Sequence, residues 1–328
     1  LVGSEMCIRD SLRIMFMGMV PNMVYNVGSA ILRAMGDSKR PLYFLIVACL
    51  SNVVLDLVFV LVFKMGIAGV AIASILAQAI SAVMVVMSLS AESMEYRFRF
   101  RQMRFEGDIL SRTIRIGLPA GFQSIMYSLS NMLIQASVNR FGTDTVASWV
   151  VLGKVDGINW MILGALGIAS MTFVGQNYGA GRLDRIQKSL KLSLLIGVCI
   201  SIVFGGALLL FGWPLFGLFT SDDTVLAMSM QLLWYFAPFY WMFVPIEIIS
   251  GALRGMGDTL IPTIITATGI CVFRVAWIYT VVPLHNSMFT VSLSYPISWV
   301  LTAIAFAIYY MIARKKLIAN APKPRTAE

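Results

Sequence analysis

Asn52 and Asp56 lie one helical turn apart in the middle of an apolar run over residues 41–63. Side chains at positions i and i+4 share one face of a helix, so a carboxylate and an amide oxygen would be stacked there. Such a pair can share a small cation or a proton. An acid inside an apolar helix indicates an ion pathway, because burying its charge is costly. The alternative is that Asp56 only joins neighbouring helices through hydrogen bonds.

A second acid, Glu247, lies in the apolar run 224–255, one turn before Gly251. A buried carboxylate is suited to proton exchange, so Glu247 is a candidate site for a proton or a cationic substrate. The alternative is a hydrogen bond to a neighbouring helix. Arg274 lies inside another apolar run and is expected to pair with Glu247 or with carbonyls at a helix end, because charges within a membrane usually pair.

Three amides lie on one side of a further predicted helix, where Gln123, Asn131 and Gln135 are separated by eight and four residues. They could line a cavity, or they could hydrogen-bond to other helices. Near the start of the next run, Lys154 and Asp156 are two residues apart. They could gate an outer mouth, but we expect a local charge pair at the interface.

The composition requires a bilayer around these residues. The chain of 328 residues is 59% hydrophobic and 12% charged, and its mean hydropathy is +0.82. A soluble domain is about a quarter charged. Runs of about 20 apolar residues indicate membrane-spanning helices. We predict an all-α membrane protein with nine spans, at residues 11–35, 41–63, 67–90, 113–140, 144–176, 189–213, 224–255, 260–283 and 288–313.

The net charge of +9 comes from Lys and Arg in short loops, which argues for a lipid surface and against a nucleic acid partner. Most of these residues fall in one set of loops, which we place in the cytoplasm together with the C-terminus. The single histidine, His285, and the four scattered cysteines favour neither a metal site nor a membrane-embedded enzyme, which would need clustered catalytic side chains.

A hexapeptide occurs twice, as Leu32–Asp37 (LRAMGD) and Leu253–Asp258 (LRGMGD), each between two apolar runs. It indicates an internal repeat. The first copy ends the first helix present, and the second ends the fourth helix of the second half. Repeat register and helix parity therefore both predict three further upstream helices, giving twelve spans in two parallel six-helix halves with a substrate path between them.

The predicted spans and the repeat divide the chain into five parts. They are a non-native leader at 1–10, a partial N-lobe at 11–95, a basic cytoplasmic linker at 96–112, a C-lobe at 113–315 and a cytoplasmic tail at 316–328.

Five motifs, in order, resemble the multidrug and toxic compound extrusion (MATE) family. They are Pro21–Asn26 leading into LRAMGD, Asn52–Asp56, Gly117–Pro119 with Gln123 and Asn131, Gly175–Ala180, and LRGMGD. The resemblance covers roughly residues 11–315 and implies helices 4–12 of a twelve-helix, two-lobe transporter. It implies a multi-pass monomer of a bacterial plasma membrane. Such a protein exports organic cations or other amphipathic compounds in exchange for H⁺ or Na⁺, with no further cofactor and no metal.

The resemblance also assigns residues. It places a cation site at Asn52, Asp56 and Ser74, although the main carboxylate of that site in many members lies on a helix absent here. Tyr127 stands near the place where some members carry a glutamate. The motif residues have a structural role: Arg33, Gly36 and Asp37; Arg254, Gly257 and Asp258; and Gly175 with Gln176 in a tight turn. The rival function is a flippase for lipid-linked saccharides of the same superfamily, expected to need several cationic residues in its cavity. We expect the chain not to transport without the missing helices.

Overall fold

The computed structural model describes residues 16–91, 98–99, 101 and 104–319, and side chains up to Arg314. The predicted leader, most of the basic stretch before Arg104 and the end of the tail lie outside this part. The chain divides into two compact units, Leu1–Phe105 and Glu106–Glu328, each considered by itself. Every regular element described is a helix.

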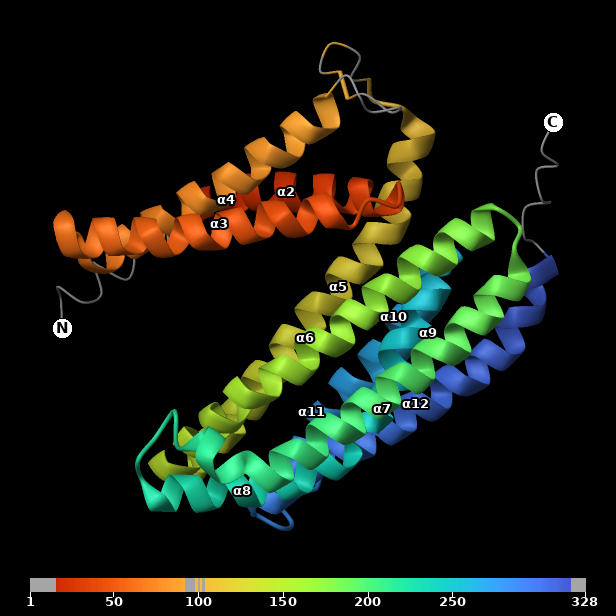
Figure 1. Cartoon of the computed structure of the whole chain (residues 1–328). Helices are drawn as coiled ribbons and strands as arrows, with labels where there is room; N and C mark the ends of the chain where they lie inside the picture. The colour runs from red at the N-terminus through yellow and green to blue at the C-terminus, as the bar shows by residue number, and fades with distance from the viewer. Residues whose placement is uncertain (1–15, 92–97, 100, 102–103, 320–328) are drawn as a thin grey trace. The chain divides into compact units, whose positions relative to one another are not determined.

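Unit 1 contains three long helices (Figure 1), α2 (Met19–Ala34), α3 (Lys39–Leu57) and α4 (Gly66–Ser90). Helix α3 continues into a π-helical segment, η1 (Val58–Val62). Helix α4 packs against both α2 and α3. The small hydrophobic core of unit 1 is formed by Leu32, Val85 and Leu89.

Unit 2 is a larger helical bundle (Figure 1). Its elements are α5 (Gly107–Val138), η3 (Asn139–Phe141), α6 (Thr143–Gly179), α7 (Leu183–Phe216), α8 (Asp223–Phe236), η4 (Ala237–Met242), α9 (Val244–Gly255), α10 (Leu260–Thr266), η5 (Ala267–Val272), α11 (Phe273–Thr280) and α12 (Met288–Ala319). Helix α6 packs most extensively against α9. Trp299, Tyr240, Phe216 and Phe306 are the largest fully buried side chains.

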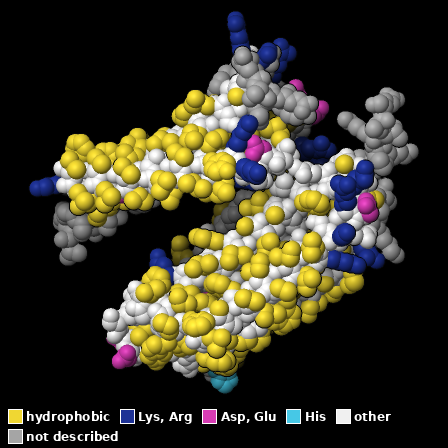
Figure 2. Space-filling model, viewed as in Figure 1, with side chains coloured by type: hydrophobic (Ala, Val, Ile, Leu, Met, Phe, Trp, Pro, Cys, Tyr) yellow, Lys and Arg dark blue, Asp and Glu magenta, His cyan; other side chains and the backbone are white. Residues whose placement is uncertain are grey.

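Seven helical stretches of the described chain are long and apolar enough to span a membrane. They correspond to seven of the nine predicted spans. Of the other two, α2 has 16 described residues, and α5 carries the polar stripe together with Arg112 and Arg115. On the visible face, hydrophobic side chains cover the flanks of the helices, as a lipid environment requires (Figure 2).

Two predicted spans contain interruptions. The run 224–255 forms α8 and α9 joined by the 3₁₀ segment η4. Pro238 lies at the start of this segment, where proline cannot donate a backbone hydrogen bond. The run 260–283 forms α10 and α11 joined by the π-helical segment η5. Sequence periodicity gave no sign of either change.

The repeated hexapeptide forms the same turn in both units. Gly36 and Gly257 have φ of 90° and 89°. The N–H of Asp37 donates to the carbonyl of Leu32 at 2.9 Å, and that of Asp258 donates to the carbonyl of Leu253 at 3.0 Å. This hydrogen-bonding pattern ends a helix with glycine in the left-handed conformation. The motif therefore ends one helix and starts the next.

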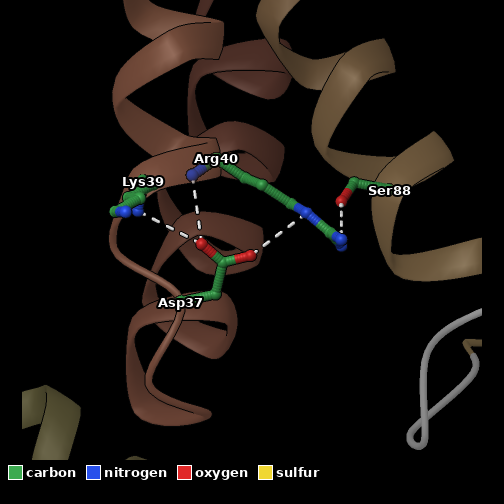
Figure 3. Close-up of polar contacts among 4 residues, drawn as sticks. All are labelled: Asp37, Lys39, Arg40 and Ser88. Atoms are coloured by element: carbon green, nitrogen blue, oxygen red, sulfur yellow. Dashed lines mark hydrogen bonds and ion pairs between the residues drawn. The ribbon is translucent and has the colours of Figure 1, made fainter.

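The charged residues of each copy have different partners. In unit 1, Asp37 Oδ1 accepts the backbone N–H groups of Lys39 and Arg40, each at 3.1 Å (Figure 3). The guanidinium of Arg40 lies 3.2 Å from Asp37 Oδ2 and donates to Ser88 of α4 at 3.5 Å (Figure 3). In unit 2, Asp258 accepts from the hydroxyl of Tyr309 on α12.

Replacing Gly257 with alanine is expected to reduce the free energy of unfolding by about 1–2 kcal/mol, because other L-residues are strained at positive φ. The matched control is Gly206→Ala in α7, where an added methyl group meets nothing within 4 Å. Thermal unfolding in detergent compares the two variants. Equal midpoints for both would show that the turn does not depend on glycine.

The segment Gly175–Ala180 was predicted as a tight turn, and this was wrong for most of it. Gly175 and Gln176 are helical, and α6 ends at Gly179. The turn is centred on Gly181, which has φ of 68°. Gly175 instead permits close packing, since an added Cβ would lie 3.2 Å from the carbonyl oxygen of Gly255 in α9.

Candidate functional site

Asn52 and Asp56 both lie on α3, which packs along α4, where Ser74 is found. All three residues are half-buried. Asn52 Nδ2 and Asp56 Oδ1 are buried and have no hydrogen-bond partner among the described residues. Buried polar atoms are normally paired, so the oxygen of Asp56 is available to a proton, a cation or a water molecule, and the amide N–H groups of Asn52 are available to an acceptor such as water. Their role in binding a cation stays a prediction.

Glu247 lies in the first turn of α9 and faces Gly167 of α6. A Cβ added at Gly167 would lie 3.0 Å from Glu247 Oε2, so the absence of a side chain there makes room for the carboxylate. Unit 2 contains a cavity that Tyr127 lines, and Glu247 is not among its lining residues.

Unit 2 contains a partly open cavity of about 410 Å³. One side is formed by α5, where Tyr127, Asn131 and Gln135 follow one another at four-residue intervals. The side-chain amide of Gln135 also donates to Asn139 at 2.9 Å. These three predicted residues thus share one wall, as their helical spacing indicates.

Gln123 is not on that wall. Its side-chain oxygen accepts from Arg254 Nη2 at 2.7 Å and lies 3.5 Å from the Thr263 hydroxyl. The amide joins α5 to the LRGMGD motif and to α10. Of the two roles predicted for Gln123, the structure shows hydrogen bonding between helices and not lining of the cavity.

Two charged residues on the cavity wall were interpreted wrongly from the sequence. Asp156 is 7% exposed and accepts from the hydroxyl of Tyr240, whereas Lys154 is exposed. Residues two apart on a helix do not face each other, which is why the expected local pair does not form. Arg274 donates through Nε to Ser298 Oγ at 2.9 Å and lies 3.9 Å above the Tyr295 ring, so neither Glu247 nor a helix end is its partner.

Aromatic rings form most of the rest of the wall, and no pattern in the sequence predicted them. Trp160 packs edge to face with Phe243 at 4.8 Å and with Trp299 at 5.6 Å between ring centroids. Trp149 packs in the same way on Tyr295 at 5.7 Å. These residues come from α6 and α12 and from Phe243, which directly follows η4, and no local spacing indicates that they meet.

Membrane-spanning helices around a cavity with convergent polar groups are the arrangement of a small-molecule site within a membrane protein. The MatE family model matches residues 7–58 and 119–280, which is more than half of the chain. The chain therefore belongs to the MatE family, and its relatives are transporters rather than enzymes.

Among its relatives, the probable multidrug resistance protein YoeA of Bacillus subtilis (strain 168) is 27% identical over 321 residues, covering 93% of this chain and 67% of YoeA. YpnP of the same organism, also named a probable multidrug resistance protein, is 28% identical over 309 residues, covering 93% of this chain and 68% of YpnP. The chain thus spans about two thirds of each.

Solved structures give the same fold. A crystal structure of MATE in the straight conformation has a TM-score of 0.86 at 19% identity, over 94% of this chain and 70% of that chain. An outward-facing multidrug resistance MATE transporter of the MOP superfamily has a TM-score of 0.83 at 19% identity, over 94% of this chain and 69% of that chain. This likeness confirms the predicted all-helical transporter fold.

Proposed function

We propose that the protein is a secondary antiporter that exports organic cations or other amphipathic compounds by alternating access in exchange for H⁺ or Na⁺. Membership of the MatE family is the observation that carries this proposal. The named relatives YoeA and YpnP, both probable multidrug resistance proteins, support it. The half-buried Asp56 supplies a group that could take up the driving ion. We place the protein in a bacterial plasma membrane with its C-terminus in the cytoplasm.

The flippase alternative receives less support from unit 2. Arg274 is the one Lys or Arg side chain on the described cavity wall. A pyrophosphate carries several negative charges and would be expected to need more than one cationic partner.

The test is export of ethidium from proteoliposomes under an imposed Na⁺ or pH gradient. It uses the 328-residue chain, and the same chain joined to the part of YoeA that it does not cover. The joined protein is expected to export ethidium with one of the two gradients and to stop when an ionophore dissipates it. Export by neither protein under either gradient would contradict the proposal.

A further inference from the structure

The cavity of unit 2 holds two side chains of opposite charge that form no ion pair with any described residue. Asp156 on α6 is 7% exposed and Arg274 on α11 is 4% exposed. Both lie on the cavity wall. An unpaired charge buried in a protein is strongly destabilising, so its retention points to a partner that arrives from outside.

The guanidinium of Arg274 is held in place by neighbouring side chains and still has N–H groups available for a ligand. Its guanidinium lies on the Tyr295 ring, and its Nε–H bonds to Ser298. A guanidinium has five N–H donors, so this bond uses one of them. The terminal nitrogens can receive a carboxylate in a two-pronged contact, the geometry that arginine prefers. The contacts with Ser298 and Tyr295 fix the orientation of the group before a ligand binds.

Asp156 is held in a similar way. Tyr240 donates its hydroxyl to Asp156 Oδ1, and Tyr240 itself is fully buried. An ionised carboxylate has about four acceptor positions, so acceptor capacity remains for an ammonium group with its three N–H donors. The wall thus offers a fixed guanidinium group and a fixed carboxyl group.

The surface between and around these groups is aromatic. Trp160 packs edge to face with Phe243 and with Trp299, which limits its movement, and it lines the cavity while only half-buried. The indole N–H of Trp299 is buried without an acceptor, and the hydroxyl of Tyr127 is buried without a partner. A cavity of about 410 Å³ falls within the usual range for small-molecule sites.

We propose that this cavity binds a compact aromatic zwitterion, with its carboxylate on Arg274, its ammonium group on Asp156 and its ring against Trp160. The proposal rests on the proposed export function and names a substrate class for it. It differs from a simple cation site because a site for cations alone gains nothing from Arg274. It differs from an apolar site because an apolar ligand would leave both charges without a partner.

Three naphthyl compounds of matched size test the assignment on the 328-residue chain in lipid nanodiscs. Naphthylalanine carries both charges, naphthylpropionate only the carboxylate, and naphthylethylamine only the ammonium group. Titration calorimetry at neutral pH gives each Kd. Naphthylalanine is expected to bind at least about tenfold more tightly than either analogue, since each lost charge-assisted hydrogen bond costs about that factor.

Variants assign each charge to its residue. Arg274→Gln should weaken the binding of naphthylalanine and naphthylpropionate about tenfold and leave that of naphthylethylamine unchanged. Asp156→Asn should weaken the binding of naphthylalanine and naphthylethylamine about tenfold and leave that of naphthylpropionate unchanged. Lys154→Gln, an exposed position on the same helix, is the matched control and should change nothing. The comparison of probes on the unaltered chain does not depend on how the variants fold.

Other patterns overturn the proposal. Equal binding of all three probes indicates an apolar pocket, and preferential binding of naphthylethylamine that is insensitive to Arg274→Gln indicates a cation site. Failure of a monodisperse, helical protein to bind any probe rejects the site. Ethidium export is measured separately, so the export function can hold while the zwitterion site fails, and the reverse can be seen equally well.

Discussion

Replacing Asp56 with asparagine is expected to abolish ion-coupled export by the chain joined to the uncovered part of YoeA. Asparagine has nearly the same shape but can neither release a proton nor offer a full negative charge to Na⁺. The buried Oδ1 of Asp56 has no protein partner among the described residues, so the substitution breaks no hydrogen bond of that atom. Ethidium export under a Na⁺ or pH gradient is the measurement.

Two controls separate a lost ion site from a damaged protein. Asp223→Asn changes an exposed acid in the first turn of α8 and should leave export intact. Asp56 does not line the cavity of unit 2, so binding of naphthylalanine should survive Asp56→Asn. Export at the original rate in Asp56→Asn would remove this carboxylate from the mechanism.

Replacing Gly251 with alanine is expected to lower the free energy of unfolding of unit 2 by about 3 kcal/mol, the upper part of the range for overpacking. The new methyl group would overlap the carbonyl oxygen of Gly167 on α6. Four residues later, Gly255 is close to the backbone at Met171 and Gly175. Small residues at this spacing let two membrane helices pack with their backbones nearly in contact.

The comparison for Gly251→Ala is Gly164→Ala, also in a long helix of the same unit. An added methyl group at Gly164 meets nothing within 4 Å. Alanine is favoured over glycine within helices by about 1 kcal/mol, so this control should be neutral or stabilising. Thermal unfolding in detergent distinguishes the two outcomes. Similar unfolding midpoints for the two variants would mean that α6 and α9 can move apart to accommodate the methyl group without loss of stability.

Local patterns in the sequence predicted the helices and the repeated turn well. Long apolar runs specify spans because the bilayer fixes their length, and Gly36 and Gly257 mark the helix ends in both units. Of the stripe predicted on α5, Asn131 and Gln135 lie on one wall of the cavity, since four-residue spacing needs no knowledge of other helices, whereas Gln123 is hydrogen-bonded to Arg254 instead.

Contacts between distant parts of the chain could not be predicted in this way. Asp156 bonds to Tyr240, 84 residues further on, while the sequence suggested only its neighbour Lys154. The three tryptophans of the cavity come from α6 and α12, and glycines 167 and 251 meet across two helices. Such pairings depend on how the helices pack, which a single sequence does not encode in any local spacing.

The π-helical segment η5 determines the direction in which Arg274 points. Thr266, Ile270, Arg274 and Ile278 follow at four-residue steps, and all are buried. In a regular α-helix each such step turns about 40° too far, so three steps would carry a side chain about 120° around the axis. The wider turn over Ala267–Val272 takes up more residues per revolution and cancels part of this drift. A chain with one residue fewer in this segment would rotate the guanidinium off the Tyr295 ring, so a single insertion or deletion there could change which molecules the pocket accepts.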